Sequence, residues 1–168
     1  METFELTPER LKEVAFLESF SDEELKTLIG LGTVHEYEAH SNIVIEGEDS
    51  WGIYVILSGS TSIIKANKVS GNCYEVGELR TGGIFGEMSI IDSAPRSATV
   101  KATSPCKVFY LSKETFENFL GESTERLTRF YQKCLKILVE RLRDLGDSYV
   151  ISQYQLWKTA IQKQKEAA

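Results

Sequence analysis

Residues 82–100 read GGIFGEMSIIDSAPRSATV and bring glycines, a carboxylate and an arginine together between β-rich segments. Gly82, Gly83 and Gly86 allow the backbone to approach a bound molecule closely, because glycine has no Cβ and adopts positive φ angles readily. The short, partly apolar run at 87–92 has room for one helical turn. We therefore expect a tight turn and a short helix here, inside a β-rich domain.

Two charged residues of this segment suit a phosphorylated sugar. The Glu87 carboxylate can accept two hydrogen bonds, as a ribose hydroxyl would supply. Arg96 offers a rigid donor fork that matches a phosphate, and Ser97 adds a hydroxyl. The amides of Ser97 and Ala98 can complete an anion-binding nest. The alternative is a Glu87–Arg96 ion pair that braces a loop, but the glycines, Pro95 and the β-rich surroundings favour a ligand-binding pair.

Short β-rich runs alternate with Gly, Ser, Asn and Pro over residues 33–111. This spacing is typical of an antiparallel sandwich or barrel. The nearly continuous apolar run IYVIL at 53–57 fits a strand inside a jelly roll. The expected strands are TVHEY (33–37), NIVIE (42–46), GIYVILS (52–58), STSIIKA (60–66), CYEVGEL (73–79), SATVKA (97–102) and KVFYLS (107–112).

The N-terminal part has the pattern of a helix. Residues 8–31 carry apolar side chains at helical spacing, after an early proline. Ser21 and Glu24 have the S-x-x-E spacing of a capping box. Gly30 and Gly32 are expected to end the helical segment.

Residues 112–168 return to a helical pattern. Ser112 is placed to cap a short helix that ends at Gly121, and Ser123 or Thr124 begins a long helix. Gly146 costs a helix about 1 kcal/mol relative to Ala, so a bend or break is expected there. The apolar positions of the long helix step alternately by four and three residues, at Tyr131, Leu135, Leu138, Leu142, Leu145 and Tyr149.

This apolar stripe, about three heptads long, is typical of a helix packed along a partner helix. Packing on the chain's own β domain is the alternative, and we expect a homodimer through the C-terminal helix. The fold prediction is α+β: an antiparallel β jelly-roll barrel flanked by N-terminal helices and a long C-terminal helix. Residues 1–123 would form the β-barrel domain with its N-terminal helices. Residues 124–168 would form a helical segment for hinge motion and dimerisation.

Charge and hydropathy exclude several classes of protein. The net charge is −6, although residues 124–168 hold nine Lys and Arg against five Asp and Glu, so the body is acidic. An acidic body disfavours non-specific nucleic-acid binding, and we expect no nucleic-acid partner. No apolar run reaches the length of about 18 residues that a membrane span needs. The acidic N-terminus lacks the apolar core of a secretory signal, so we expect no membrane association and a cytoplasmic location.

Catalytic and metal-binding motifs are missing from the sequence. Cys73, Cys106 and Cys134 form no C-x-x-C pair, so reduced thiols are expected. His35 and His40 do not form the H-x-H of a metal-binding jelly roll and are expected on the surface or in turns. No Ser-His-Asp pattern, G-x-S-x-G or phosphate-binding P-loop occurs. We expect no enzyme activity, no metal and no cofactor.

The segment at 82–100 resembles the phosphate-binding segment of the cyclic nucleotide-binding domain family. This family includes regulatory subunits of cyclic-nucleotide-dependent kinases, cyclic-nucleotide-gated channels and the bacterial catabolite activator protein. Its pattern is roughly F-G-E-[LIA]-[AG]-L, a short spacer, and P-R-x-A-[TS]. The matching residues are Phe85, Gly86, Glu87, Pro95, Arg96, Ala98 and Thr99, whereas Met88, Ser89 and Ile90 are small departures.

A second family signature covers IVIEGEDSWGIYVILSG at 43–59. Gly47, Gly59 and the apolar run between them lie where the family pattern has them. Ser50 stands where Gly or Ala is usual, and Trp51 is bulkier than the residue usual nearby. Both departures are expected to reshape a turn and to touch no predicted ligand contact.

The resemblance implies roles for the charged and neighbouring residues. Glu87 would bind the ribose 2′-hydroxyl, and Arg96 would bind the cyclic phosphate. Ser97 and Ala98 would support the phosphate. The implied ligand is therefore cAMP or cGMP.

The resemblance also implies contacts for the sugar and the base. The backbone of Gly86 and Met88 would hold the sugar, and Val76 would line the base pocket. The Ser97 hydroxyl could contact a guanine amino group, but serine also occurs there in relatives that bind cAMP. Near Arg141 the bacterial activator has a Thr that reads adenine, and this chain departs from it. We expect cAMP in preference to cGMP.

The expected function is a stand-alone cyclic nucleotide sensor that signals by rearranging its C-terminal helices. Only about 20 residues follow Gly146, too few for the helix-turn-helix module of the bacterial activator. A downstream effector protein or the second subunit would detect the rearrangement. The alternatives are a ligand-free scaffold and a fragment of a larger cyclic-nucleotide-regulated transcription factor.

Overall fold

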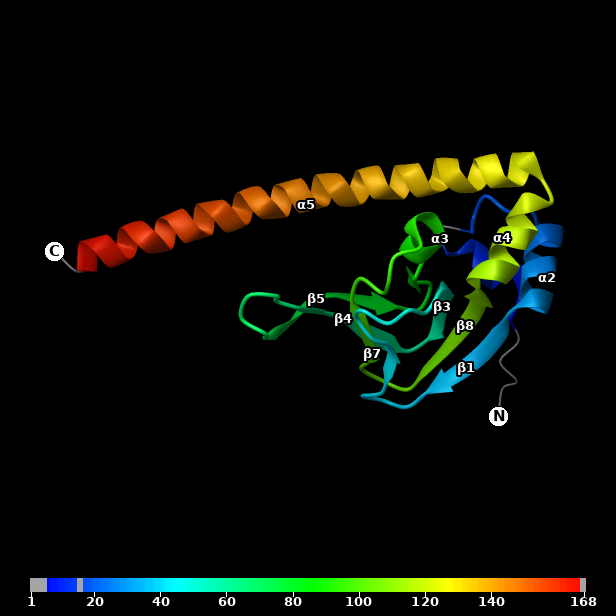
Figure 1. Ribbon diagram of the computed structural model, residues 1–168, viewed down its shortest axis with the longest axis horizontal. Coiled ribbons are helices and arrows are strands. Elements are labelled where there is room, and N and C mark those ends of the chain that lie inside the picture. The colour runs from blue at the N-terminus through cyan, green and yellow to red at the C-terminus, as the bar shows by residue number, and fades with distance from the viewer. Residues whose placement is uncertain (1–5, 15–16, 167–168) are drawn as a thin grey trace. The chain divides into compact units, whose positions relative to one another are not determined.

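The computed structural model describes residues 6–14 and 17–166 (Figure 1). Contacts within the chain divide it into two compact units, Met1–Leu127 and Thr128–Ala168. The first unit holds every strand and the shorter helices. The second consists of the long C-terminal helix beyond its first turn.

The strands of the first unit form two antiparallel sheets of four strands each, ordered β1-β8-β3-β6 and β2-β7-β4-β5. Each expected β-rich run contains a strand, so those predictions are confirmed. The additional strand, β6, has two residues and lies in the glycine-rich segment, where no alternating pattern could indicate it. The strands are β1 (Thr33–Tyr37), β2 (Asn42–Val44), β3 (Gly52–Ser58), β4 (Ser60–Ala66), β5 (Cys73–Arg80), β6 (Ile84–Phe85), β7 (Thr99–Ala102) and β8 (Cys106–Ser112).

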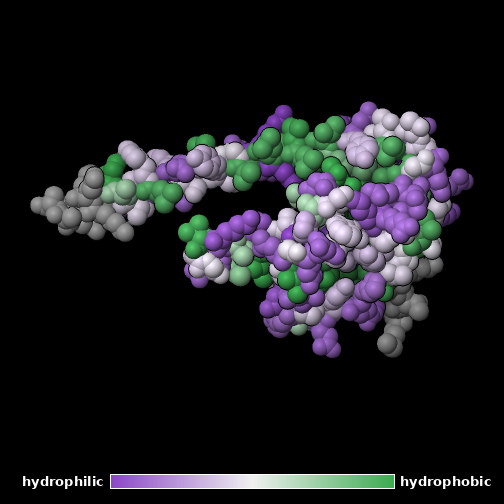
Figure 2. Space-filling view, in the orientation of Figure 1, coloured by the Kyte–Doolittle hydropathy of each residue, from purple (hydrophilic) through white to green (hydrophobic). Residues whose placement is uncertain are grey.

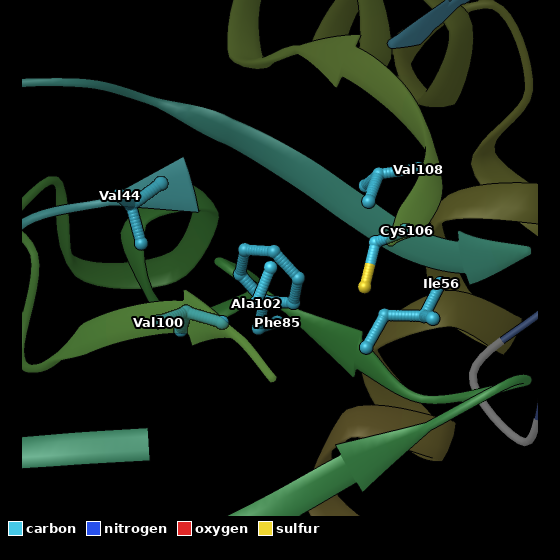
Figure 3. Packing of buried hydrophobic residues seen from close by; sticks show 7 residues of the cluster. All are labelled: Val44, Ile56, Phe85, Val100, Ala102, Cys106 and Val108. Atoms are coloured by element: carbon cyan, nitrogen blue, oxygen red, sulfur yellow. The ribbon is translucent and has the colours of Figure 1, made fainter. Parts of the chain in front are cut away.

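A closed barrel is not confirmed, because no strand among the described residues pairs with both sheets. The core lies between the two sheets instead. Side chains from β2 and β7 point toward those from β3, β6 and β8, as Figure 3 shows. Burial of these apolar side chains is worth roughly 25 cal/mol per Å². The cluster comprises Val44, Ile56, Phe85, Val100, Ala102, Cys106 and Val108.

The N-terminal segment forms two helices, α1 (Pro8–Lys12) and α2 (Asp22–Leu31), so the prediction of continuous helix over 8–31 is wrong. The reason lies in the capping box. Ser21 has the extended backbone that an N-cap needs, with ψ of 163°, and therefore begins a new helix. The capping box itself is confirmed, since the Ser21 hydroxyl accepts from the Glu24 amide at 3.3 Å and the Glu24 carboxylate accepts from the Ser21 amide at 2.8 Å. The helix ends before Gly32 rather than at Gly30.

The remaining helices are α3 (Met88–Asp92), α4 (Lys113–Gly121) and α5 (Thr124–Glu166). The single turn expected at 87–92 is thus confirmed, as is the cap of α4 by Ser112. The helix α5 runs through Gly146 without the expected break. One glycine costs too little to interrupt a helix of this length. In the described part of the chain, no helix combines the length and apolar character that a membrane span requires.

Candidate functional site

Gly86 forms a tight turn between β6 and α3, with φ of +84°. A Cβ here would come within 2.3 Å of the Gly52 carbonyl oxygen and 2.5 Å of Nη1 of Arg96. Any side chain would therefore clash with the backbone and with the guanidinium. Gly86 thus lets the backbone pass close to Arg96, whereas its predicted approach to a bound molecule stays a prediction.

The backbone of Arg96 is fixed by the turn that follows β2. The Gly47 amide donates to the Arg96 carbonyl at 2.8 Å, and the Arg96 amide donates to the Glu48 carbonyl at 3.0 Å. These two hydrogen bonds join the segment at 82–100 to the one at 43–59. The two sequence signatures are therefore parts of one structural unit.

The Arg96 side chain is only 5% exposed. Its Nε donates to the Ser50 hydroxyl at 3.0 Å. Its Nη1 donates to the Gly52 carbonyl at 3.2 Å and lies 3.4 Å from the Ser89 hydroxyl. The guanidinium carbon lies 5.1 Å from the centre of the Tyr54 ring. The remaining nitrogen, Nη2, is buried and has no hydrogen-bond partner.

Arg96 is therefore a buried cation whose partners are all neutral. Burial raises the pKa of the Tyr54 phenol, although the Arg96 charge acts in the opposite direction, so this ring remains uncharged near neutral pH. Among the residues that the structure describes, no carboxylate forms an ion pair with Arg96, and the alternative Glu87–Arg96 pair is not formed. An uncompensated buried charge is costly. An anion at Nη2 would remove that cost.

Glu87 is also buried, with 6% of its surface exposed, at the position that precedes α3. Its neighbours in the segment differ in exposure. Ser97 and Met88 are exposed, and their side chains meet with Oγ 4.0 Å from Sδ. Ala98 is half-buried. The structure thus places the two charged residues inside the segment and their neighbours at its surface.

Val76 lies on β5, the edge strand of the second sheet, and is 59% exposed. It stands opposite the irregularity in pairing between Ile63 and Ile64 of β4. Its predicted place beside a base stays a prediction. Lys65, also on β4, reaches the segment from this sheet and donates to the Ser97 carbonyl.

A family model described as the cyclic nucleotide-binding domain matches residues 34–123. The chain belongs to the cyclic nucleotide-binding domain family. This confirms the resemblance inferred from the two sequence signatures. The family contains regulatory, ligand-binding domains rather than catalytic ones.

The chain is also similar in sequence and in structure to known cyclic nucleotide-binding proteins. The chain is 34% identical over 117 residues to a cAMP-dependent protein kinase regulatory subunit of Candida albicans. The matched region covers 70% of this chain and 24% of the relative. The chain thus spans about a quarter of that relative's length. A solved cyclic nucleotide-binding domain of Methylobacillus flagellatus has a TM-score of 0.71 at 24% identity, over 82% of this chain and 80% of that one. The regulatory domain of Toxoplasma gondii PKA, solved with cAMP, has a TM-score of 0.64 at 25% identity, over 75% of this chain and 48% of that one.

Sequence reasoning missed the residues that surround Arg96 in this cyclic nucleotide-binding domain. Ser50 was expected to touch no predicted ligand contact, and that prediction is wrong, because its hydroxyl accepts from Arg96. Ser89 was noted only as a small departure from the family pattern. The sequence did offer one signal for these residues: Ser50 and Ser89 each add a hydroxyl where the family pattern has Gly or Ala. Tyr54 was assigned only to an apolar strand.

Lys113, the first residue of α4, was also missed. Its Nζ donates to the Ser89 carbonyl at 3.0 Å and to the Ser93 hydroxyl at 2.5 Å. Ser93 ends α3 in a left-handed conformation, with φ of 55°. Lys113 thus connects the segment at 82–100 to α4. Within the described residues, no group of three or more His, Cys, Asp or Glu is arranged to hold a metal.

Proposed function

We propose that this domain binds a cyclic nucleotide through the segment at 82–100. The observation that carries the proposal is the Arg96 guanidinium, buried with an unpartnered Nη2 and with neutral partners only. A cyclic phosphate carries one negative charge and acceptor oxygens, which match this site. Such an anion would both satisfy Nη2 and compensate the buried charge.

The other ligand contacts follow from the positions around Arg96. The amides of Ser97 and Ala98 support the phosphate, and Glu87 accepts from the ribose 2′-hydroxyl. Backbone groups of Gly86 and Met88 hold the sugar. The base lies toward β5, with Val76 against its face.

We favour cAMP over cGMP as the ligand. The Candida relative is a cAMP-dependent regulatory subunit, and the Toxoplasma domain was solved with cAMP. The Ser97 hydroxyl is exposed and allows either base. The domain then acts as a cytoplasmic sensor without catalytic activity.

Signalling is proposed to pass from the ligand to α5 through α4. Ligand binding draws the segment at 82–100 inward and shifts α3. Lys113 transmits this shift to α4, because it binds both the Ser89 carbonyl and the Ser93 hydroxyl. Residues 124–168 then change their packing in a homodimer or against an effector protein, as a shift between two states.

Thermal unfolding with added nucleotides tests this function. A ligand at about 100 times its Kd stabilises a protein by about 2.7 kcal/mol. For a chain of this size, that corresponds to a rise in Tm of roughly 5–10 °C. We expect this shift with cAMP, a smaller one with cGMP, and little with 5′-AMP, whose phosphate is not cyclic. No shift with either cyclic nucleotide would contradict the proposal, and so would an equal shift with 5′-AMP.

A further inference from the structure

The Ser50 hydroxyl holds one end of the Arg96 guanidinium. Ser50 lies in the turn between β2 and β3, and its Oγ accepts from Nε at 3.0 Å. The same turn binds the Arg96 backbone through Gly47 and Glu48. The backbone and Nε of Arg96 are therefore both held by this turn, which leaves the arginine side chain little freedom to rotate.

The Ser89 hydroxyl faces the Nη1 end of the Arg96 guanidinium. Ser89 is buried in α3, and its Oγ donates to the Gly86 carbonyl at 2.8 Å. Because its single proton is used there, the hydroxyl presents a lone pair to Nη1 of Arg96, 3.4 Å away. Nη1 also donates to the Gly52 carbonyl. Nε and Nη1 are thus occupied, and Nη2 is the nitrogen left for a ligand.

The chemistry of these holding groups matters as much as their geometry. A carboxylate in their place would neutralise the guanidinium and compete with an incoming phosphate. A hydroxyl orients the fork but leaves its positive charge uncompensated. A side chain already held in its binding geometry also loses less conformational freedom when the ligand arrives.

We propose that Ser50 and Ser89 are positioning residues that hold Arg96 in its anion-binding geometry before the ligand binds. The inference rests on the proposed function for its ligand, a cyclic nucleotide. Both serines are departures from the family pattern, and both place a hydroxyl on the same guanidinium. The paired departure gives this chain a pre-oriented arginine without a carboxylate bound to the guanidinium.

Titration of cAMP into Ser50→Ala and Ser89→Ala tests this role. Hydrogen bonds to charged groups are worth enough that each variant should bind roughly 5–50-fold more weakly than the wild type. Ser50→Thr keeps a hydroxyl and should restore binding to within about threefold of wild type. Ser41→Ala removes an exposed hydroxyl that donates to the Glu38 carbonyl and serves as the matched control. Unchanged affinity in folded Ser50→Ala and Ser89→Ala would overturn the proposal.

A second readout does not depend on nucleotide binding. The Nε–H resonance of Arg96, observed by NMR in the free protein, should be protected from exchange in the wild type and Ser50→Thr. It should lose that protection in Ser50→Ala, and an unaltered resonance would overturn the proposal. If the wild type bound neither nucleotide, the proposed function would fail, while this resonance would still decide whether Ser50 holds the arginine.

A double-mutant cycle separates positioning from a general loss of structure. Lysine has no Nε–H at the guanidinium position, so Ser50→Ala should add almost no further loss of cAMP affinity in an Arg96→Lys background. A full additional loss would show that Ser50 acts independently of Arg96, and the positioning role would be wrong.

Discussion

A single residue, Arg96, links the segment at 82–100 to the segment at 43–59. Its backbone pairs with Gly47 and Glu48, and its guanidinium is buried among neutral groups. Burial without a carboxylate is unfavourable for the free protein and is expected where a bound anion supplies the missing charge. Glu87 is buried in the same short segment. We propose that the two residues divide the ligand between them, phosphate to Arg96 and sugar to Glu87.

Replacing Glu87 tests this division. Wild-type protein should bind cAMP about 10–100-fold more tightly than 2′-deoxy-cAMP, because a hydrogen bond to a charged group contributes about 1.5–3 kcal/mol. In Glu87→Gln the carboxylate is lost, and calorimetric Kd values for the two nucleotides should converge. Undiminished discrimination in the variant would place the 2′-hydroxyl elsewhere.

Arg96 and Glu87 could be singled out as candidate site residues from the sequence, because both lie in one local motif with a characteristic spacing. The Ser50–Arg96 contact could not be predicted from the sequence, because it joins residues 46 positions apart in the chain. A departure from the family pattern showed that Ser50 was unusual but not which side chain it would meet. Contacts of this kind depend on the tertiary fold.

At the scale of the elements, the ends of the helices organise the first unit. The α2 cap supplies Glu24, whose carboxylate also binds Arg126 in the first turn of α5 at 3.0 Å. The Arg126 guanidinium lies over the Phe119 ring, 3.9 Å from its centre, and so connects α4 to the same site. The capping box was visible in the sequence, and its N-cap geometry implies a helix start. The break before α2 could therefore have been predicted at Ser21.

The α2 cap should contribute measurably to stability. Ser21→Ala leaves the Glu24 amide without its acceptor and should lower the free energy of unfolding by about 1 kcal/mol. Urea unfolding monitored by circular dichroism measures this change. Thr27→Ala is the matched control, since Thr27 only donates back to the Glu23 carbonyl on the same helix and should not be destabilising. Equal losses in both variants would argue against the cap.

Lys113 should couple the ligand-binding segment to α4. Lys113→Met removes the bonds to the Ser89 carbonyl and the Ser93 hydroxyl but keeps an apolar stem of similar length. Hydrogen exchange of α5 amides should change on cAMP addition in the wild type and much less in the variant. Affinity for cAMP should change by less than about fivefold, because Lys113 is assigned no ligand contact and each lost hydrogen bond contributes only about 1 kcal/mol to stability. An identical exchange response in both proteins would exclude Lys113 as the link.

At the scale of the whole molecule, the second unit presents apolar side chains to solvent along α5, visible as green atoms in Figure 2. Exposed apolar stripes of this kind mark interaction surfaces. Their four-three spacing was evident from the sequence alone, and it fits a second copy of the same helix. The exposed positions on this stripe are Tyr131, Leu135, Leu138, Leu142, Leu145, Tyr149 and Leu156. Exposed apolar residues of α5 outside the stripe are Val139, Val150, Ile151, Tyr154 and Trp157.

The proposed homodimer predicts a clear effect of a charge in this stripe. Wild-type protein should sediment as a dimer at micromolar concentration in analytical ultracentrifugation. Leu142→Glu buries a carboxylate at the interface and should shift the protein to monomer. Gln153→Glu adds the same charge outside the stripe and should remain dimeric. A wild-type monomer at high concentration would contradict dimerisation through α5.

Calorimetric titration of cAMP into wild-type and Arg96→Ala protein tests whether the buried Arg96 binds the cyclic phosphate. Loss of the charge-assisted contact should cost about 2–4 kcal/mol, so the variant should bind roughly 30–1000-fold more weakly than the wild type. Equal affinity of the two proteins for cAMP, with both folded, would show that Arg96 does not bind the phosphate.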